Sequence, residues 1–170
     1  MSITLQRIQR FLESTKLTFE VMGCDPTLSD TAIFCKEYGI DLNDSVNTII
    51  IKTKTGESKY VACALLASTR LDMNKTIKKK LETRKVSFAD ALETTKLTGM
   101  EIGGVTPIEL PVSLPLWIDS KIMTRSIIVL GGGNRSSKIK ISPRIFNFTE
   151  NTEIVDGLAN KNINSIDPQN

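Results

Sequence analysis

Two clusters of glycine constrain the fold of this chain more than any other feature of its sequence. Six of the ten glycines lie in the segments 99–107, GMEIGGVTP, and 131–135, GGGNR. Each cluster follows a segment with regular patterning, and glycine there permits a positive φ and a close approach of bare main chain to another group. Successive N–H groups in such a loop can form a concavity for a carbonyl oxygen, a carboxylate or a phosphate. A pair of ordinary turns is the plainer alternative.

The segments around these clusters predict a mixed α/β domain of the α+β type, because strands and helices do not alternate as in a doubly wound parallel sheet. Apolar spacing predicts helices over 3–14 with Ser2 as N-cap, from Ser29 or Asp30 to Gly39, over 73–81, over 89–97 and briefly after Pro143. β-branched and alternating runs predict strands over 17–22, 46–51, 59–66, near Val86, and over 116–118, 126–130 and 138–141. We expect 46–51 and 59–66 to form a hairpin.

The chain of 170 residues has the length of one domain, which we place at residues 1–158. Residues 159–170 form a polar, asparagine-containing tail that we expect to be frayed. The sequence contains no apolar run long enough for a membrane span, and its first twenty residues lack the apolar core of a signal peptide. We therefore expect a cytoplasmic protein with no membrane partner.

The chain contains no histidine, which excludes Ser-His-Asp and Cys-His catalysis and every histidine-dependent metal site. Cys24, Cys35 and Cys63 fit neither a CxxC pair nor a disulfide framework, so we expect buried or free thiols. Neither a GxxxxGK[ST] string nor a GxGxxG string after a strand is present, which disfavours nucleotide hydrolysis and dinucleotide binding. These motifs give no indication of a cofactor, and the net charge of +3 is weak support for an anionic partner.

One glycine segment is specific enough to suggest a family. The string LTGMEIGGVTP at 97–107 resembles the tGxxxGGxxP loop of the YbaK family of aminoacyl-tRNA deacylases, which is similar to the editing domain of bacterial prolyl-tRNA synthetases. Other segments are similar to family segments in the same order: VNTIII at 46–51, KYVACA at 59–64, TRLD at 69–72, WIDS at 117–120 and GGGNR at 131–135. The resemblance covers about residues 3–158.

The resemblance implies a fold of mixed strands that form a partly closed β-barrel flanked by helices. It implies trans-editing in the cytoplasm, which is the hydrolysis of a mischarged aminoacyl ester at the 3′ end of tRNA without a metal. The implied partners are tRNA and, as a further candidate, an aminoacyl-tRNA synthetase.

Two positions depart from the family pattern. Asn47 stands where well-studied members have a lysine that activity requires, and Lys138 stands where an acidic residue is usual. Lys52 ends the same strand but lies on its opposite face and about 17 Å away, so we do not expect it to substitute.

Ester cleavage needs fixed donors for the developing oxyanion, and the backbone N–H groups of Gly103, Gly104 or Val105 are the candidates. Asn47 can supply an amide donor but cannot act as a general base. The other expected substrate contacts are Thr48, Thr106, Asp119, Gly131 and Gly132, and the expected tRNA contacts are Arg70 and Arg135. For Asn47, Thr48, Thr106 and Asp119 a purely structural role is the alternative: a strand start, satisfied core hydroxyls, or the start of a turn.

Three functions therefore remain open. The first is an aminoacyl-tRNA deacylase whose substrate is unknown. The second is a non-catalytic module that binds an aminoacyl group or a nucleotide, which the loss of the lysine at Asn47 suggests. The third is a subunit that docks on a synthetase. A basic run can contact tRNA or be solvated helix surface; it consists of Lys75, Lys78, Lys79, Lys80, Arg84 and Lys85.

Overall fold

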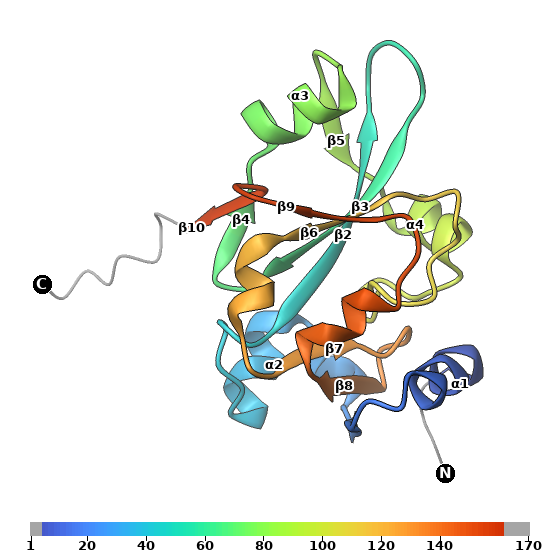
Figure 1. Ribbon diagram of the computed structural model, residues 1–170, viewed down its shortest axis with the longest axis vertical. Helices are drawn as coiled ribbons and strands as arrows, with labels where there is room; N and C mark the ends of the chain where they lie inside the picture. Colours follow the sequence, from blue (N-terminus) through green and yellow to red (C-terminus); the bar gives the residue numbers. More distant parts are fainter. Residues whose placement is uncertain (1–4, 162–170) are drawn as a thin grey trace, which may run out of the picture.

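The computed structural model describes residues 5–161, and its elements are shown in Figure 1. The α-helices are α1 (Gln6–Thr15), α2 (Thr31–Tyr38), α3 (Lys78–Leu81) and α4 (Ala91–Thr98). Short 3₁₀ helices span Pro26–Leu28, Ser120–Thr124 and Pro143–Asn147, and a π-helical turn, Met73–Ile77, precedes α3. The strands are β1 (Phe19–Gly23), β2 (Val46–Thr53), β3 (Tyr60–Leu66), β4 (Thr69–Leu71), β5 (Val86–Phe88), β6 (Leu116–Asp119), β7 (Ile128–Gly131), β8 (Ser137–Ile141), β9 (Thr152–Val155) and β10 (Ala159–Lys161).

The described strands form three sheets, which confirms the predicted mixed α/β class, and these sheets are not closed into a barrel. The largest sheet has the order β5-β2-β3-β6-β9, the second has the order β1-β8-β7, and β10 pairs with β4. The hydrogen-bonded order of the described strands does not close. The two larger sheets meet at one parallel bridge between Ser45 and Val129, and a single bridge is too short to continue the sheet around a barrel.

The expected hairpin forms between β2 and β3, which pair antiparallel from Val46 opposite Leu66 to Lys52 opposite Tyr60. Side chains on the two faces of β2 enter different cores, since successive strand residues point to opposite sides. Val46 and Ile50 pack in the larger core with α1 and the second sheet, whereas Ile51 packs in a smaller core beneath α3. Figure 1 shows α3 beside the hairpin at one end of the molecule, and α1 and α2 near β7 and β8 at the other.

Two helices end where the sequence predicts. Gly39 follows α2 with φ of 67°, and Gly99 follows α4 with φ of 68°, a left-handed conformation that glycine adopts without steric cost. A capping box between Asp90 and Glu93 begins α4. At α1, Leu5 occupies the N-cap position, and the expected cap Ser2 lies outside the described residues.

The C-terminal strands β9 and β10 are not predicted by the sequence. β9 extends the large sheet parallel to β6, and β10 begins at the boundary where we expected a frayed tail. Ala159 is fully buried, and its N–H donates to Asp119 Oδ2 at 2.9 Å. Regular structure therefore continues to Lys161. The sequence does not predict these two strands, because short polar strands have no periodic pattern.

The three cysteines are buried free thiols, as expected. Burial in the smaller core raises the pKa of Cys63 to about 12, so this thiol stays protonated at neutral pH. Among residues 5–161, no helix has the length and apolarity to cross a membrane.

Candidate functional site

A cavity of about 220 Å³ lies where the edge of β2 is left uncovered between the two larger sheets. β5 pairs with β2 only from Ile51 onward, and the Ala89 N–H reaches the Ile50 carbonyl at 2.9 Å. At the other end, Ser45 bridges to Val129, so the strand edge between these contacts faces the cavity. The lining consists of Thr31, residues 45–50, Ala89, Thr94, Ile102, Gly103, Val105, residues 129–131 and Lys138.

The two glycine segments form one wall of this cavity by packing main chain against main chain. A Cβ atom on Gly104 would lie 2.0 Å from the Asn134 carbonyl oxygen, and one on Gly131 would lie 2.6 Å from the Gly104 oxygen. Two hydrogen bonds between main-chain atoms join the segments: Gly133 N–H donates to the Gly104 oxygen at 2.7 Å, and Glu101 N–H donates to the Gly133 oxygen at 3.2 Å. Larger residues would separate the loops, which explains why glycine recurs in both.

Within the first loop, residues 101–104 form a tight turn that orients its peptide groups. Gly104 N–H donates to the Glu101 oxygen at 2.9 Å, and Gly103 has φ of 86°, as the third position of a type II turn requires. The amide of Gly104 is thus already paired inside the turn. This corrects the expectation that Gly104 donates to a substrate, since the turn geometry was not visible in the sequence.

The neighbouring amides of Gly103 and Val105 are oriented differently. The Ile102 carbonyl accepts from Arg135 Nη1 at 3.1 Å, and the Gly104 carbonyl accepts from Gly133. In a trans peptide the N–H points opposite to the C=O, so the N–H groups of Gly103 and Val105 point away from the second loop. Both residues line the cavity, and neither N–H has an acceptor within residues 5–161.

Arg135 holds the first loop in place. Besides the bond to Ile102, its Nε and Nη2 atoms donate to the Pro26 carbonyl at 3.1 and 2.9 Å, and Nη1 lies 3.8 Å from an oxygen of Asp30. A guanidinium engaged in three directions acts as a brace between the loop and the segment before α2. The expected contact of Arg135 with phosphate stays a prediction.

Asn47 and Thr48 contribute polar side chains from β2. The Thr31 hydroxyl donates to Asn47 Oδ1, so the Asn47 amide nitrogen is the part of this side chain that remains available as a donor. The Thr48 hydroxyl is buried and has no hydrogen-bond partner in the described part of the chain. A buried hydroxyl without a partner is costly unless something else satisfies it, and at a cavity wall a ligand can do so.

Lys138 is the cavity residue whose role the sequence did not predict. It enters from β8, its side chain is 94% buried, and its Nζ donates to the carbonyls of Ser29 at 3.0 Å and Gly103 at 3.2 Å. The ammonium group also lies 5.1 Å from the centre of the Phe34 ring. Burial lowers the pKa of Lys138, because no carboxylate forms an ion pair with it among residues 5–161. The sequence gives no signal for this position, because the alternation of lysine and isoleucine over residues 138–141 groups Lys138 with the exposed Lys140.

Several expected site residues lie outside the cavity. Asp119 is fully buried and accepts from the N–H groups of Lys121 and Ala159 at 3.0 and 2.9 Å, which is the structural role of a turn-starting aspartate. Thr106 is also fully buried beyond the lining. Gly132 faces Ser137, whose Oγ would lie 2.0 Å from an added Cβ. The structure therefore brings together Asn47, Thr48, Gly103, Val105 and Gly131, and leaves out Gly104, Thr106, Asp119 and Gly132.

The remaining basic residues lie away from the cavity. As expected, Lys52 does not reach it, and instead pairs with Glu93 at 2.7 Å. From the basic run, Lys80 pairs with Glu153 at 2.8 Å and lies 4.8 Å from the Trp117 ring centre. Arg70 lines a separate cleft. No group of residues within 5–161 could hold a metal ion through His, Cys, Asp or Glu side chains.

The model of the aminoacyl-tRNA editing domain family matches residues 25–148, which include β2, both glycine loops and Lys138. The chain belongs to the aminoacyl-tRNA editing domain family. This membership confirms the resemblance drawn from the 97–107 segment.

Solved structures share the fold of this editing domain. The crystal structure of hypothetical protein APE2540 is 24% identical, with a TM-score of 0.78, and the match covers 91% of this chain and 100% of that one. The crystal structure of a candidate trans-editing enzyme for prolyl tRNA synthetase is 20% identical, with a TM-score of 0.75 and coverage of 92% and 97%. A signal transduction protein candidate from Marinobacter aquaeolei has a TM-score of 0.59 at 15% identity, and the match covers 91% of this chain but 31% of that chain.

Proposed function

We propose that this editing domain hydrolyses the aminoacyl ester at the 3′ end of a mischarged tRNA, in trans and in the cytoplasm. The observation that carries the proposal is the pair of unpaired N–H groups, Gly103 and Val105, which border a cavity of suitable polarity. Family membership supports an editing role, and the name of one structural neighbour refers to trans-editing for prolyl tRNA synthetase.

The two amides would bind the carbonyl oxygen of the ester. When a nucleophile attacks the carbonyl carbon, this oxygen gains negative charge, and donors already in place stabilise it without reorganising. Removal of one such donor typically costs about 10²–10³-fold in rate. A Cβ on Gly103 would lie 2.3 Å from Arg135 Nη1, so glycine at this position lets the guanidinium pack against the loop. The bond from Arg135 to the Ile102 carbonyl then fixes the orientation of the 102–103 peptide.

The attacking group would be a water molecule, because attack by the neighbouring ribose hydroxyl would only move the ester from one ribose oxygen to the other. No Asp or Glu lines the cavity, so no carboxylate there can serve as general base. An aminoacyl ester is activated enough to need less help than an amide. A bond forms from the water oxygen to the carbonyl carbon, and this water gives up one proton to solvent. The bond from the carbonyl carbon to the ribose oxygen then breaks, and the ribose oxygen takes one proton from solvent, so that the products are the free amino acid and the ribose hydroxyl. Asn47 and Thr48 would hold the ribose or the amino acid by hydrogen bonds.

Lys138 would act as a positioning residue for the first loop. Its Nζ donates to the Gly103 carbonyl at 3.2 Å and to the Ser29 carbonyl at 3.0 Å, which ties the loop to the segment before α2. Its charge also raises the electrostatic potential of a cavity that would accept an oxyanion. Lys138 would thus fix the position of the first loop and would also supply the positive charge that Asn47 lacks.

The second candidate is a module that binds an aminoacyl group or a nucleotide without catalysis. The observation that favours it is the neutral amide of Asn47, which faces the cavity in place of the family's lysine.

The experiment is incubation of the protein with a panel of tRNAs, including tRNA for proline, each charged with a non-cognate amino acid. We expect release of at least one amino acid faster than in buffer, and a loss of this release in Thr48→Val and Asn47→Ala. The matched control is Thr124→Val, whose hydroxyl is exposed and bonds to Lys121. No release above buffer from any tRNA contradicts the deacylase. Activity that appears only in Asn47→Lys supports the binding module.

A further inference from the structure

A second cleft, of about 580 Å³, adjoins the candidate site along β2. Asn47 and Ile49 line both hollows, so the two meet at the start of this strand. The cleft is bounded on its far side by β4 and by β10, which pairs with β4. Its volume lies within the range of about 300–1,000 Å³ that is typical of small-molecule sites. A ligand whose reacting end lies in the first cavity can therefore extend into the second.

The cleft carries an exposed aromatic ring. Phe88 is 58% exposed and pairs with Ile51 in the register of β5 and β2, so its side chain lies on the same face of the sheet as those of Asn47 and Ile49. A phenylalanine more than half exposed lacks the burial that normally stabilises it. At the mouth of a cleft such a ring is a platform on which a planar group can stack.

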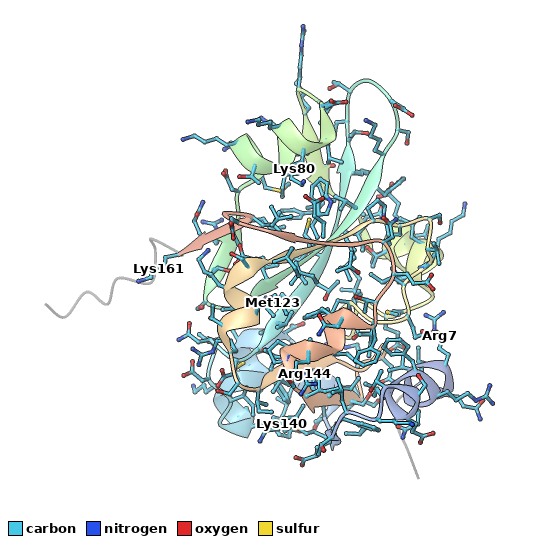
Figure 2. All side chains as sticks on the ribbon, in the orientation of Figure 1. Arg7, Lys80, Met123, Lys140, Arg144 and Lys161 are labelled. Carbon is cyan, nitrogen blue, oxygen red and sulfur yellow. The ribbon has the colours of Figure 1, made fainter. Side chains whose placement is uncertain are left out.

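Two cations border the same cleft without an ion-pair partner. Arg70 lies opposite Asn160 in the β4–β10 register, and Lys161 lies opposite Thr69. Figure 2 shows Lys161 at the edge of the molecule formed by β10. Neither cation has an acidic partner among residues 5–161.

The cleft also contains one carboxylate, that of Asp72. Asp72 accepts hydrogen bonds from the N–H groups of Lys75 and Thr76 and from the Thr76 hydroxyl, at 3.2, 3.3 and 3.0 Å. These bonds to Thr76 and Lys75 lower the pKa of Asp72 against the opposing effect of burial, so it stays ionised as the cap of the π-helical turn. Arg70 and Lys161 carry two positive charges against the one negative charge of Asp72, so the lining of the cleft has a net charge of +1.

We propose that this cleft binds an unpaired nucleotide of the tRNA acceptor end, with its base stacked on Phe88 and its phosphate near Arg70 and Lys161. Aromatic platforms combined with a basic groove are the means by which proteins bind single-stranded nucleic acid without reading its sequence. The inference rests on the proposed function, because it names where the tRNA lies when its ester occupies the first cavity. The proposed nucleotide site does not include Arg135, whose guanidinium is already bonded to the carbonyls of Ile102 and Pro26.

The test measures binding of the uncharged trinucleotide CCA to the whole chain and to two variants, Phe88→Ala and Arg70→Ala. We expect about tenfold weaker binding for Phe88→Ala, from the loss of one stacking contact. For Arg70→Ala we expect weaker binding and a salt dependence whose slope falls by about 0.7, as for one lost phosphate contact on a single strand. The matched controls are Phe148→Ala and Arg144→Ala, an exposed ring and an exposed cation outside the cleft. Equal affinity of all five proteins, or no binding of CCA by the unaltered chain, overturns the proposal.

A second readout separates this proposal from the deacylase itself. The same variants are assayed on a mischarged tRNA and on a small ester of the same amino acid that has no nucleotide. We expect Phe88→Ala to raise KM about tenfold for the tRNA and to leave the small-ester rate unchanged. An equal loss on both substrates contradicts a nucleotide subsite and indicates damage to the first cavity. If the chain hydrolyses no ester but CCA binding still depends on Phe88 and Arg70, the subsite stands and the deacylase fails.

Discussion

The two glycine loops have similar composition but differ in whether the N–H groups of their peptides are hydrogen-bonded within the protein. In the loop at 131–135, the N–H groups of Gly132 and Gly133 are consumed by the carbonyls of Ser137 and Gly104. In the loop at 99–107, the N–H groups of Gly103 and Val105 stay unpaired at a cavity. The second loop uses its donors within the fold, and the first loop keeps two donors unpaired beside the cavity. Glycine content therefore predicts close main-chain packing, but the pattern of hydrogen bonds decides which loop can act on a substrate.

The largest effect that would test this comparison is expected for Gly104→Ala. The new Cβ would lie 2.0 Å from the Asn134 carbonyl oxygen, and backbone cannot move aside as a flexible side chain can. We expect destabilisation of about 3 kcal/mol and loss of activity. The control is Gly39→Ala, which has φ of 67° and open space around its Cβ, and should cost about 1 kcal/mol. Chemical denaturation measures both, and equal losses would show that the contact between the loops is not tight.

A smaller effect is expected when the contacts of the Arg135 side chain are removed and no atoms are added between the loops. Arg135→Ala deletes the donors to the carbonyls of Ile102 and Pro26, so the 102–103 peptide loses its fixed orientation. We expect kcat/KM to fall about 100-fold with the fold retained.

The substrate used distinguishes this role of Arg135 from a phosphate contact. A positioning role lowers hydrolysis of a small ester without phosphate as much as hydrolysis of aminoacyl-tRNA. A loss confined to the tRNA substrate would show that Arg135 contacts phosphate, and the brace would then be unimportant.

Lys138 links β8 to the first loop. Its variant Lys138→Met tests this link through the activity and through the pH dependence of the free energy of unfolding. We expect about tenfold lower activity, because the Gly103 carbonyl loses its charged donor. Burial lowers the pKa of Lys138 from 10.5, so the unfolded chain binds this proton more tightly than the folded chain. At a pH below both pKa values, the folded protein bears the full cost of burying the charged Lys138. As pH rises toward 10.5 the folded protein loses this proton first, so the free energy of unfolding increases.

The pH effect is measured as the difference in unfolding free energy between wild type and Lys138→Met from about pH 7 to pH 10. The difference should shift in favour of wild type as pH rises. Burial raises the pKa values of Cys24 and Cys35 and the charge of Lys138 lowers them, so these thiols titrate differently in the two proteins. Both proteins are therefore compared with Cys24 and Cys35 replaced by alanine. A difference that does not change with pH would contradict a buried, charged Lys138.

The smallest effect is expected for Lys52→Met. This lysine does not line the cavity, and it forms a partly exposed ion pair with Glu93 in the first turn of α4. Exposed ion pairs contribute little, and we expect unchanged hydrolysis of any ester. Loss of activity in the assay of released amino acid would show that β2 transmits changes to the cavity and that the comparison of loops is incomplete.

Much of the fold follows from local patterns. The hairpin of β2 and β3, the glycine ends of α2 and α4, and the free buried cysteines are all predicted correctly, because each depends on residues close in the sequence. The strands β9 and β10 are missed, since they form by pairing with distant strands and have no pattern of their own. The partly closed barrel was predicted from the family resemblance. In the structure a single bridge, from Ser45 to Val129, connects the two larger sheets, and they do not close.

The site is predicted less completely than the fold. The sequence identifies Asn47, Gly103 and Val105, because the family loop and the strand before it are distinctive. It cannot show that the Gly104 amide is used within a turn, or that Asp119 is fixed by a strand forty residues later. Lys138 is recognised as unusual but not as a cavity residue, since its direction depends on how β8 packs.

The central claim is that the amides of Gly103 and Val105 bind the oxyanion. The most direct measurement is the amide spectrum of the ¹⁵N-labelled protein, titrated with a stable phosphonate analogue of an aminoacyl-adenosine tetrahedral intermediate. We predict that the amide protons of Gly103 and Val105 shift downfield most strongly, while those of Gly104 and Gly132 keep their positions. Saturating binding that shifts Gly104 or the second loop instead, or that leaves Gly103 and Val105 unchanged, would contradict the account.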